Sequence, residues 1–237
     1  MSKSMKRRQK RLERKNAKRK AKRTQIARSR NLSLAQKMAV ASTYPVYGCF
    51  YTLAIDDNGI GIVVVARKMP DGQIAMGLFL VDRYCLGVKD AFGRVLPRSD
   101  YDEFVVECEQ KKGGIQELHP PTARRLVEDA IGYANDLGFT PHPDYRRAAP
   151  IFGDIDPEQA TRTWEFGRDG KPFFVAGPYD TPARCRRIQN TLLQHCGPDG
   201  FDFVMPMSSP LSLSEYAIEA DGDDWDDDDW EIVDDDE

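Results

Sequence analysis

The sequence predicts an α+β fold, in which a mostly antiparallel sheet of about five or six strands is packed by helices and flanked by disordered charged tails. Apolar, β-branched runs separated by "NG" and "DG" turns between residues 44 and 82 indicate antiparallel hairpins, because glycine tolerates the positive φ of such turns. The segment "TARRLVEDAIGYANDLG" (122–138) repeats apolar residues every three or four positions, as an amphipathic helix does. Charges of one sign are concentrated at each end of the chain, so the middle is the part that is expected to form the folded domain.

The domain is expected to open with a meander of three strands, at 44–55, 60–68 and 73–82. The second run is apolar throughout, which is typical of a strand buried on both faces. The Asn-Gly and Asp-Gly pairs between the runs predict the two tight turns that join them.

A loop or short helix is expected at 83–93, followed by a helix that Ser99 caps and that ends near Gln110. The clearest helix of the chain lies at 122–138, where Gly138 ends it. Its predicted buried face consists of Leu126, Val127, Ala130, Ile131, Ala134 and Leu137.

The next segment is rich in proline and mixed in pattern. Two short helices are expected to begin at Asp144 and Pro157, and a second hairpin is expected at 161–177.

The domain is predicted to close with a helix and a strand. Thr181 caps a helix that begins at Pro182, and the last strand is expected at 201–206. The predicted buried stripe of this helix is Cys185, Ile188 and Leu192.

We divide the 237 residues into a basic arm (1–31), a single α+β domain (32–206) and an acidic tail (207–237). The arm holds fifteen Lys or Arg and one acid, whereas residues 215–237 hold fourteen acids and no Lys or Arg. The formal net charge of −4 therefore hides two opposite extremes.

The basic arm is predicted to be disordered, or to become helical against a polyanion, because Leu12 and Ile26 are its only large aliphatic residues after Met5. Clustered Lys and Arg replace the condensed counterions of nucleic acid, so phosphate binding is favoured over a merely solubilising role. A membrane surface fits less well, because the arm lacks a Trp, Phe or Leu face. The predicted nucleic-acid-binding residues are Lys6, Arg7, Arg8, Lys10, Arg11, Arg14, Lys15, Lys18, Arg19, Lys20, Lys22 and Arg23.

The acidic tail contains two tryptophans, Trp225 and Trp230, which a purely solvated tail does not need. Blocks of carboxylates are commonly interaction tails, and large rings among them indicate a partner-binding element. The nearest basic surface is the arm of the same chain, so the tail is expected to compete with nucleic acid for it. An alternative is an interaction module whose tail binds a basic protein.

The domain also contains three arginine doublets, at 124–125, 146–147 and 186–187. One interpretation is that each doublet places one guanidinium in a shared phosphate-binding patch, since arginine binds phosphate through two parallel hydrogen bonds. The alternative is that these arginines face solvent separately.

An enzymatic alternative rests on "FLVDRYCLGVKDAFG" (79–93). If the second part of this segment is helical, Lys89 lies one turn from Cys85 and favours its thiolate. His142, with Asp144 two residues later, is the candidate base. The simpler interpretation is that Cys85 belongs to the core, because a cysteine after an apolar strand usually does.

A second enzymatic alternative is a metal-dependent nuclease that uses Asp56, Asp57 and Asp82 with Asp154 and Asp156. The first two of these lie in a predicted turn, where Asp is expected for the turn alone. The sequence contains no glycine-rich phosphate loop and no zinc-type Cys/His spacing, so no cofactor and no metal are expected.

Neither a membrane partner nor secretion is expected. No apolar run reaches the roughly 18 residues of a membrane span, and no signal peptide is recognisable. The five cysteines form no C-x-x-C pair, and an odd number of cysteines without a signal peptide indicates reduced thiols in a cytoplasmic compartment.

The stretch "FLVDRYCLGVKDAF" (79–92), followed by "AIGYANDLGFTPHPDY" (130–145) and preceded by a basic arm, resembles a set of uncharacterised bacterial proteins. The resemblance covers roughly residues 1–155. It implies a bacterial cytosolic protein and carries no activity or site residues with it.

The working prediction is a non-enzymatic protein associated with nucleic acid, RNA above all, or with the ribosome. In this interpretation the basic arm binds phosphates and the acidic tail modulates access to them. The hydrolase and the interaction module are the two alternatives.

Overall fold

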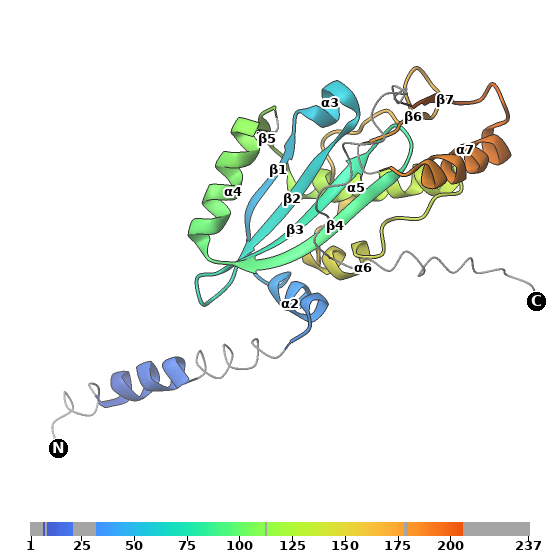
Figure 1. Cartoon of the computed structure of the whole chain (residues 1–237). Coiled ribbons are helices and arrows are strands. Elements are labelled where there is room, and N and C mark those ends of the chain that lie inside the picture. The colour runs from blue at the N-terminus through green and yellow to red at the C-terminus, as the bar shows by residue number, and fades with distance from the viewer. Residues whose placement is uncertain (1–6, 8, 21–31, 112, 178–179, 206–237) are drawn as a thin grey trace, which may run out of the picture. The chain divides into compact units, whose positions relative to one another are not determined.

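The computed structural model describes residues 7, 9–20, 32–111, 113–177 and 180–205 (Figure 1). The acidic tail, including Trp225 and Trp230, therefore lies outside the described residues. Among the described residues, no helix combines the length and the hydropathy that a membrane crossing requires.

A five-stranded sheet in the order β4-β3-β2-β1-β5 forms the centre of the domain (Figure 1). Every pair of neighbouring strands in this sheet is antiparallel. The strands are β1 (Val46–Thr52), β2 (Ile60–Lys68), β3 (Ile74–Asp82), β4 (Gly87–Leu96) and β5 (Ile115–Glu117). The predicted fold class and the three-strand meander are thereby confirmed.

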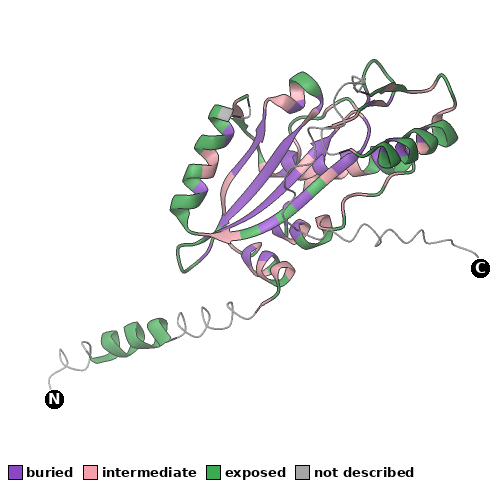
Figure 2. Ribbon diagram, viewed as in Figure 1, coloured by how far each residue is buried: buried purple, intermediate pink, exposed green. Residues whose placement is uncertain are grey.

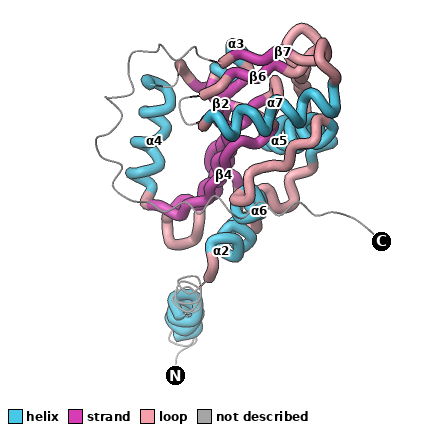
Figure 3. The backbone as a smooth tube through the Cα atoms, turned by 45° about the vertical axis from the view of Figure 1, so that its right-hand side comes forward, coloured by secondary structure: helices cyan, strands magenta, loops and turns pink. Residues whose placement is uncertain are grey.

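Helices lie on both faces of this sheet (Figure 3). One face carries α4, and the other carries α2, α5 and α6. The helices are α2 (Leu34–Ala41), α3 (Ala54–Asn58), α4 (Arg98–Lys111), α5 (Pro120–Asp136), α6 (Tyr145–Ala148) and α7 (Pro182–Cys196), with 3₁₀ turns at Ala149–Ile151 and Pro157–Gln159. The helix expected at 122–138 thus begins two residues earlier than predicted.

The strands β2 and β3 are buried on both faces, which explains their continuous apolar sequence (Figure 2). Val63 and Phe79 pack in one cluster with Leu126 of α5, whereas Val64 and Met76 pack in another on the α4 side. Alternation along a strand sends successive side chains into these two clusters.

A third cluster joins α7 to a separate two-stranded parallel sheet of β6 (Phe173–Val175) and β7 (Asp202–Val204). Thr181 caps α7 by accepting a hydrogen bond from the backbone of Arg184, as predicted. The predicted stripe Cys185, Ile188 and Leu192 is buried in this cluster.

The prediction of a loop or short helix at 83–93 holds only for the turn at 83–86 and is wrong beyond it, because β4 begins at Gly87. Residues 90–94 alternate between exposed and buried, and the buried positions are the small residues Ala91 and Gly93. A Cβ on Gly93 would lie 3.1 Å from Met38 Sδ, so α2 packs directly on the strand there. Small inward residues gave no apolar signal, which is why the strand was missed.

The hairpin predicted at 161–177 is formed only at its turn. Arg168 and Lys171 pair across the Asp-Gly turn as an isolated antiparallel bridge, but the described residues on either side do not extend it into a ladder, and β6 pairs in parallel with β7 instead. Two boundaries differ as well. The strand expected to end at residue 55 ends at Thr52, and α3 follows it and ends before Gly59, which has a φ of 77°. The helix α4 begins at Arg98, so Ser99 lies inside it rather than at its cap.

Candidate functional site

The basic arm is helical where the structure describes it. Residues 9–20 form a helix, Arg7 is helical as well, and every described residue from 7 to 20 is exposed (Figure 2). Leu12, the one large aliphatic residue in this segment, is 54% exposed. A helix that buries no face gains no stability from packing, so packing does not explain the sequence of this segment. Its concentrated positive charge does.

The charge of this helix is almost entirely positive. Residues 9–20 contain one acid, Glu13, and seven bases. The bases are Lys10, Arg11, Arg14, Lys15, Lys18, Arg19 and Lys20. Of the other predicted arm residues, Lys6, Arg8, Lys22 and Arg23 lie outside the described residues.

Cys85, the candidate nucleophile, is fully buried in the cluster around α7. Burial raises the pKa of its thiol, which disfavours the thiolate that a nucleophile requires. Lys89 lies on β4, so the helical spacing assumed for the pair is wrong. Its ammonium lies 3.9 Å from the carboxylate of Asp180.

His142, the candidate base, lies in the loop before α6. Its Nδ1 accepts a hydrogen bond from the backbone of Asp144 at 3.3 Å and lies 3.8 Å from the Asp90 carboxylate. The carboxylate of Asp144 accepts a hydrogen bond from Arg147 at 2.8 Å. Among the hydrogen bonds and ion pairs of the described chain, none joins Cys85 to His142.

Four of the five carboxylates of the nuclease alternative, those of Asp56, Asp82, Asp154 and Asp156, make separate contacts within the domain. Asp82 is 2% exposed and accepts hydrogen bonds from the backbone of Tyr84 and Cys85, and burial raises its pKa. Asp156 caps the turn that starts at Pro157, and Asp154 lies 3.9 Å from Arg67. The described residues contain no group of three His, Cys, Asp or Glu side chains able to hold a metal ion.

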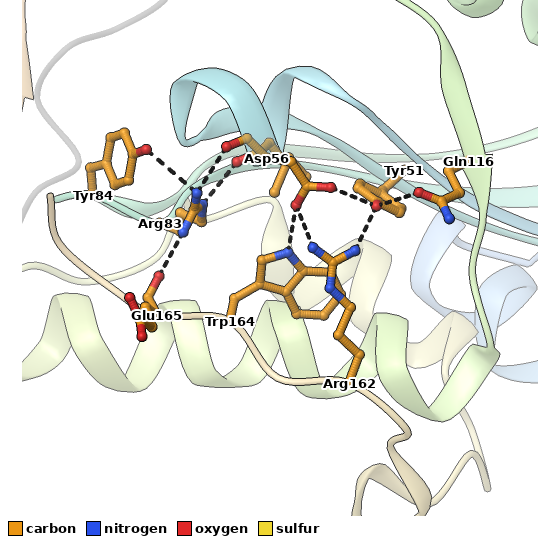
Figure 4. A network of polar contacts seen from close by, with 9 residues as sticks. Tyr51, Asp56, Arg83, Tyr84, Gln116, Arg162, Trp164 and Glu165 are labelled. Carbon is orange, nitrogen blue, oxygen red and sulfur yellow. Dashed lines mark hydrogen bonds and ion pairs between the residues drawn. The ribbon is translucent and has the colours of Figure 1, made fainter.

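Asp56 belongs to a polar network that joins several elements of the domain (Figure 4). Its carboxylate accepts hydrogen bonds from Tyr51 at 2.7 Å, from Arg162 at 2.7 Å and from the indole of Trp164 at 2.9 Å. The hydroxyl of Tyr51 also accepts a bond from Arg162 and lies 2.7 Å from Oε1 of Gln116. We call these five residues, from β1, α3, β5 and the segment before β6, the Asp56 cluster.

The Asp56 cluster is electrostatically balanced. Burial alone would raise the pKa of Asp56, but the hydrogen bonds from Trp164, Tyr51 and Arg162 outweigh it and hold that pKa below its ordinary value. Burial and the bond to Asp56 raise the pKa of Tyr51. The Arg162 guanidinium also lies over the Trp164 ring, 4.3 Å from its centroid.

Arg83 extends the network by donating hydrogen bonds to backbone carbonyls. The acceptors are Ile55 at 2.8 Å, Asp56 at 3.1 Å and Glu165 at 2.8 Å (Figure 4). These bonds fix α3 to the irregular segment after residue 160. The bonds made by Asp56, Tyr51 and Arg83 lie within the protein and join β1, α3 and the segment before β6, so the network stabilises the fold.

The sequence points to Asp56 but not to its partners. The pattern at 161–177 predicts a hairpin for Arg162 and Trp164, and nothing in the sequence relates them to a position more than 100 residues earlier. The sequence Arg162-x-Trp164 does not by itself predict a contact with Asp56. That contact can be identified only in the folded chain.

Comparison with known proteins adds no assignment. No family model matches the chain, and neither the curated proteins nor the solved structures include a significant match.

Proposed function

We propose that this protein is a non-enzymatic nucleic-acid-binding protein that binds the phosphate backbone through its basic arm, with RNA, free or in the ribosome, as its target. The observation that carries the proposal is the helix at 9–20, which holds seven bases against one acid and exposes every residue. The proposed compartment is the bacterial cytoplasm, where RNA is an abundant polyanion.

The physical argument begins with repulsion inside the arm. Lys10, Arg14 and Lys18 follow one another at i, i+4 spacing, and like charges at that spacing destabilise an isolated helix by about 0.2–0.5 kcal/mol per pair. A phosphate backbone reverses the sign of this term, because each base that replaces a condensed counterion releases it to solvent. Binding and helix stability therefore support each other.

The acidic tail is proposed to modulate access to the arm. Residues 215–237 carry fourteen acids and no Lys or Arg, so they match the arm in charge. Single exposed ion pairs contribute only about 0–1 kcal/mol, but many pairs on one chain act at a raised effective concentration. Trp225 and Trp230 give the tail apolar area for a partner in addition to charge.

The proposal is tested by measuring binding of the full chain to labelled RNA and DNA between 50 and 200 mM salt. An arm that contacts six to ten phosphates loses about 10³–10⁵ in affinity over that range. Replacing the seven bases of residues 9–20 by Gln should abolish most of the binding, whereas deleting residues 215–237 should tighten it at low salt.

Two results would contradict the proposal. Unchanged RNA affinity after the seven substitutions would show that the helix at 9–20 is not the binding element. Unchanged affinity after deletion of the tail would remove the tail from the account and leave the arm in it. Co-sedimentation with ribosomes, compared in the same variants, separates a ribosomal target from free RNA.

A further inference from the structure

The bases of the helix at 9–20 are not spread evenly around it. Successive residues of an α-helix are about 100° apart, and at that spacing six of the seven bases fall within about half of the circumference. We call this half the basic face, and its members are Lys10, Arg11, Arg14, Lys15, Lys18 and Arg19. The other half carries Gln9, Leu12, Glu13, Asn16, Ala17 and Lys20.

The basic face consists of two rows of cations. One row is Lys10, Arg14 and Lys18, and the other starts at Arg11, with its members again four residues apart. Within each row the spacing along the helix axis is about 6 Å, and the two rows lie about 100° apart around it. Two rows of cations on one side of the helix match the phosphates of two strands better than those of a single strand.

A helix that only attracts polyanions has no need of this arrangement, because charge on any side serves equally well. A single strand that follows the helix contacts one row at a time. The opposite half is not apolar either, since Leu12 is its one large aliphatic residue, so a membrane surface has nothing to bury there.

We propose that this helix binds in a groove of double-helical nucleic acid, with its basic face turned toward the two phosphate strands that border the groove. This inference rests on the proposed phosphate binding by the arm, and it extends the target from RNA in general to any duplex, of DNA or of opened RNA, whose groove admits a helix. An α-helix with its side chains is about 10–12 Å wide, which fits the major groove of B-form DNA at about 12 Å. Each row of cations then faces one wall, and the half with Leu12 and Glu13 faces solvent.

Two kinds of duplex offer such a groove. B-form DNA does so directly, whereas the major groove of regular A-form RNA is deep and narrow. Where unpaired nucleotides widen its major groove, an RNA helix offers a groove comparable in width to that of B-form DNA. The probes are therefore a 20-base-pair DNA duplex, a regular RNA duplex, an RNA duplex with a bulge, and single-stranded RNA and DNA of equal length.

The decisive variant moves charge around the helix without changing composition. The exchanges Gln9→Lys with Lys10→Gln, Lys15→Asn with Asn16→Lys, and Ala17→Lys with Lys18→Ala transfer three bases to the opposite half. A matched control exchanges Lys and Arg within the basic face, through Lys10→Arg with Arg11→Lys, Arg14→Lys with Lys15→Arg, and Lys18→Arg with Arg19→Lys. Both variants are made in the full chain and keep its net charge.

The first variant should lose at least about tenfold in affinity for the DNA duplex or the bulged RNA at 100 mM salt, and its salt slope should fall by about 3, or 0.9 for each displaced base. Its affinity for single strands, and all affinities of the control, should change less than about threefold. Equal effects on duplex and single strand would overturn the inference and leave the proposed function standing. Failure of the wild-type chain to bind any probe would overturn both.

Discussion

Arginine has opposite uses in the basic arm and in the folded domain. In the described arm the arginines are exposed and lie on a helix that buries no face. In the domain, Arg67 is 4% exposed and donates hydrogen bonds to the backbone carbonyls of Tyr44, Ile151 and Phe152, and Arg83 binds three carbonyls in the same way. The difference teaches that an arginine in the domain does not by itself identify a ligand site, because the guanidiniums of Arg67 and Arg83 already donate to backbone carbonyls.

The arginine doublet Arg124–Arg125 is also used for contacts inside the domain. Arg124 binds Glu128 and the carbonyl of Ile155, and Arg125 binds Asp129 and Glu158. The idea of a shared phosphate patch therefore does not hold for this doublet. Both of its members fasten α5 to the segment around Pro157.

The largest expected effect on stability belongs to Arg67. Arg67→Met leaves three carbonyls without their charged donor, and we expect the free energy of unfolding to fall by about 4 kcal/mol. Urea denaturation measures this, with Arg186→Met as the exposed control, for which we expect a change within about 0.5 kcal/mol. A loss below 1 kcal/mol for Arg67→Met would break the contrast between the two regions.

The next effect concerns Asp82, whose pKa burial raises above its ordinary value of 3.8. The folded state then holds the proton more tightly than the unfolded state, so the stability contributed by this group is lost as pH rises above about 4. Asp82→Asn keeps an acceptor for the amides of Tyr84 and Cys85 and cannot ionise, so we expect stability at pH 7 to be equal or higher. Asp82→Ala removes the acceptor and should cost about 1–3 kcal/mol.

A smaller effect with the opposite pH dependence is expected at Asp56. Its pKa lies below the ordinary 3.8, so its contribution is complete above about pH 5 and is lost as pH falls through the folded pKa. Asp56→Asn and Arg162→Gln should each cost about 1–2 kcal/mol, with strong coupling in a double-mutant cycle because the two groups share one bond network. Thermal unfolding from pH 3 to 7 should show the cost of Asp56→Asn shrinking toward the acid end. A cost independent of pH would argue that the carboxylate charge is not what holds Arg162.

The smallest effect on stability is expected in the arm. Replacing the seven bases of residues 9–20 by Gln should change the free energy of unfolding of the domain by less than about 0.5 kcal/mol, since no described residue of that helix is buried. A larger destabilisation in urea would show that the arm supports the fold and would weaken its assignment as a ligand-binding element.

Much of the fold could be read from the sequence because its signals are local. The apolar runs of β2 and β3, the amphipathic pattern around Leu126 and the cap at Thr181 each depend on neighbours within one turn or one strand. The strand β4 could not be predicted from the sequence, because its inward residues Ala91 and Gly93 are small. They lie at a close contact with a helix, and that contact depends on Met38, which is far away in the chain. The parallel pairing of β6 with β7 depends on a distant partner in the same way.

The candidate sites divide along the same line. The basic arm could be found from composition alone, because its property is the sum of its charges. The Asp56 cluster could not, because Tyr51, Gln116 and Arg162 come together only through the order of the strands and an irregular return segment. Cys85 and His142 looked plausible in sequence, yet burial and hydrogen bonding give each of them a structural role.

The most direct test compares three arginines of the arm with three of the domain. Arg11, Arg14 and Arg19 are changed to Gln in one variant, and the exposed Arg146, Arg186 and Arg187 in the other, so both lose the same charge. The slope of log Kd for RNA against log salt concentration is then measured for each. We expect the arm variant to lower the slope by about 2–3, at 0.7–0.9 per phosphate contact, and the domain variant to leave it unchanged. Equal slopes in the two variants would contradict the claim that the arm is where this protein binds nucleic acid.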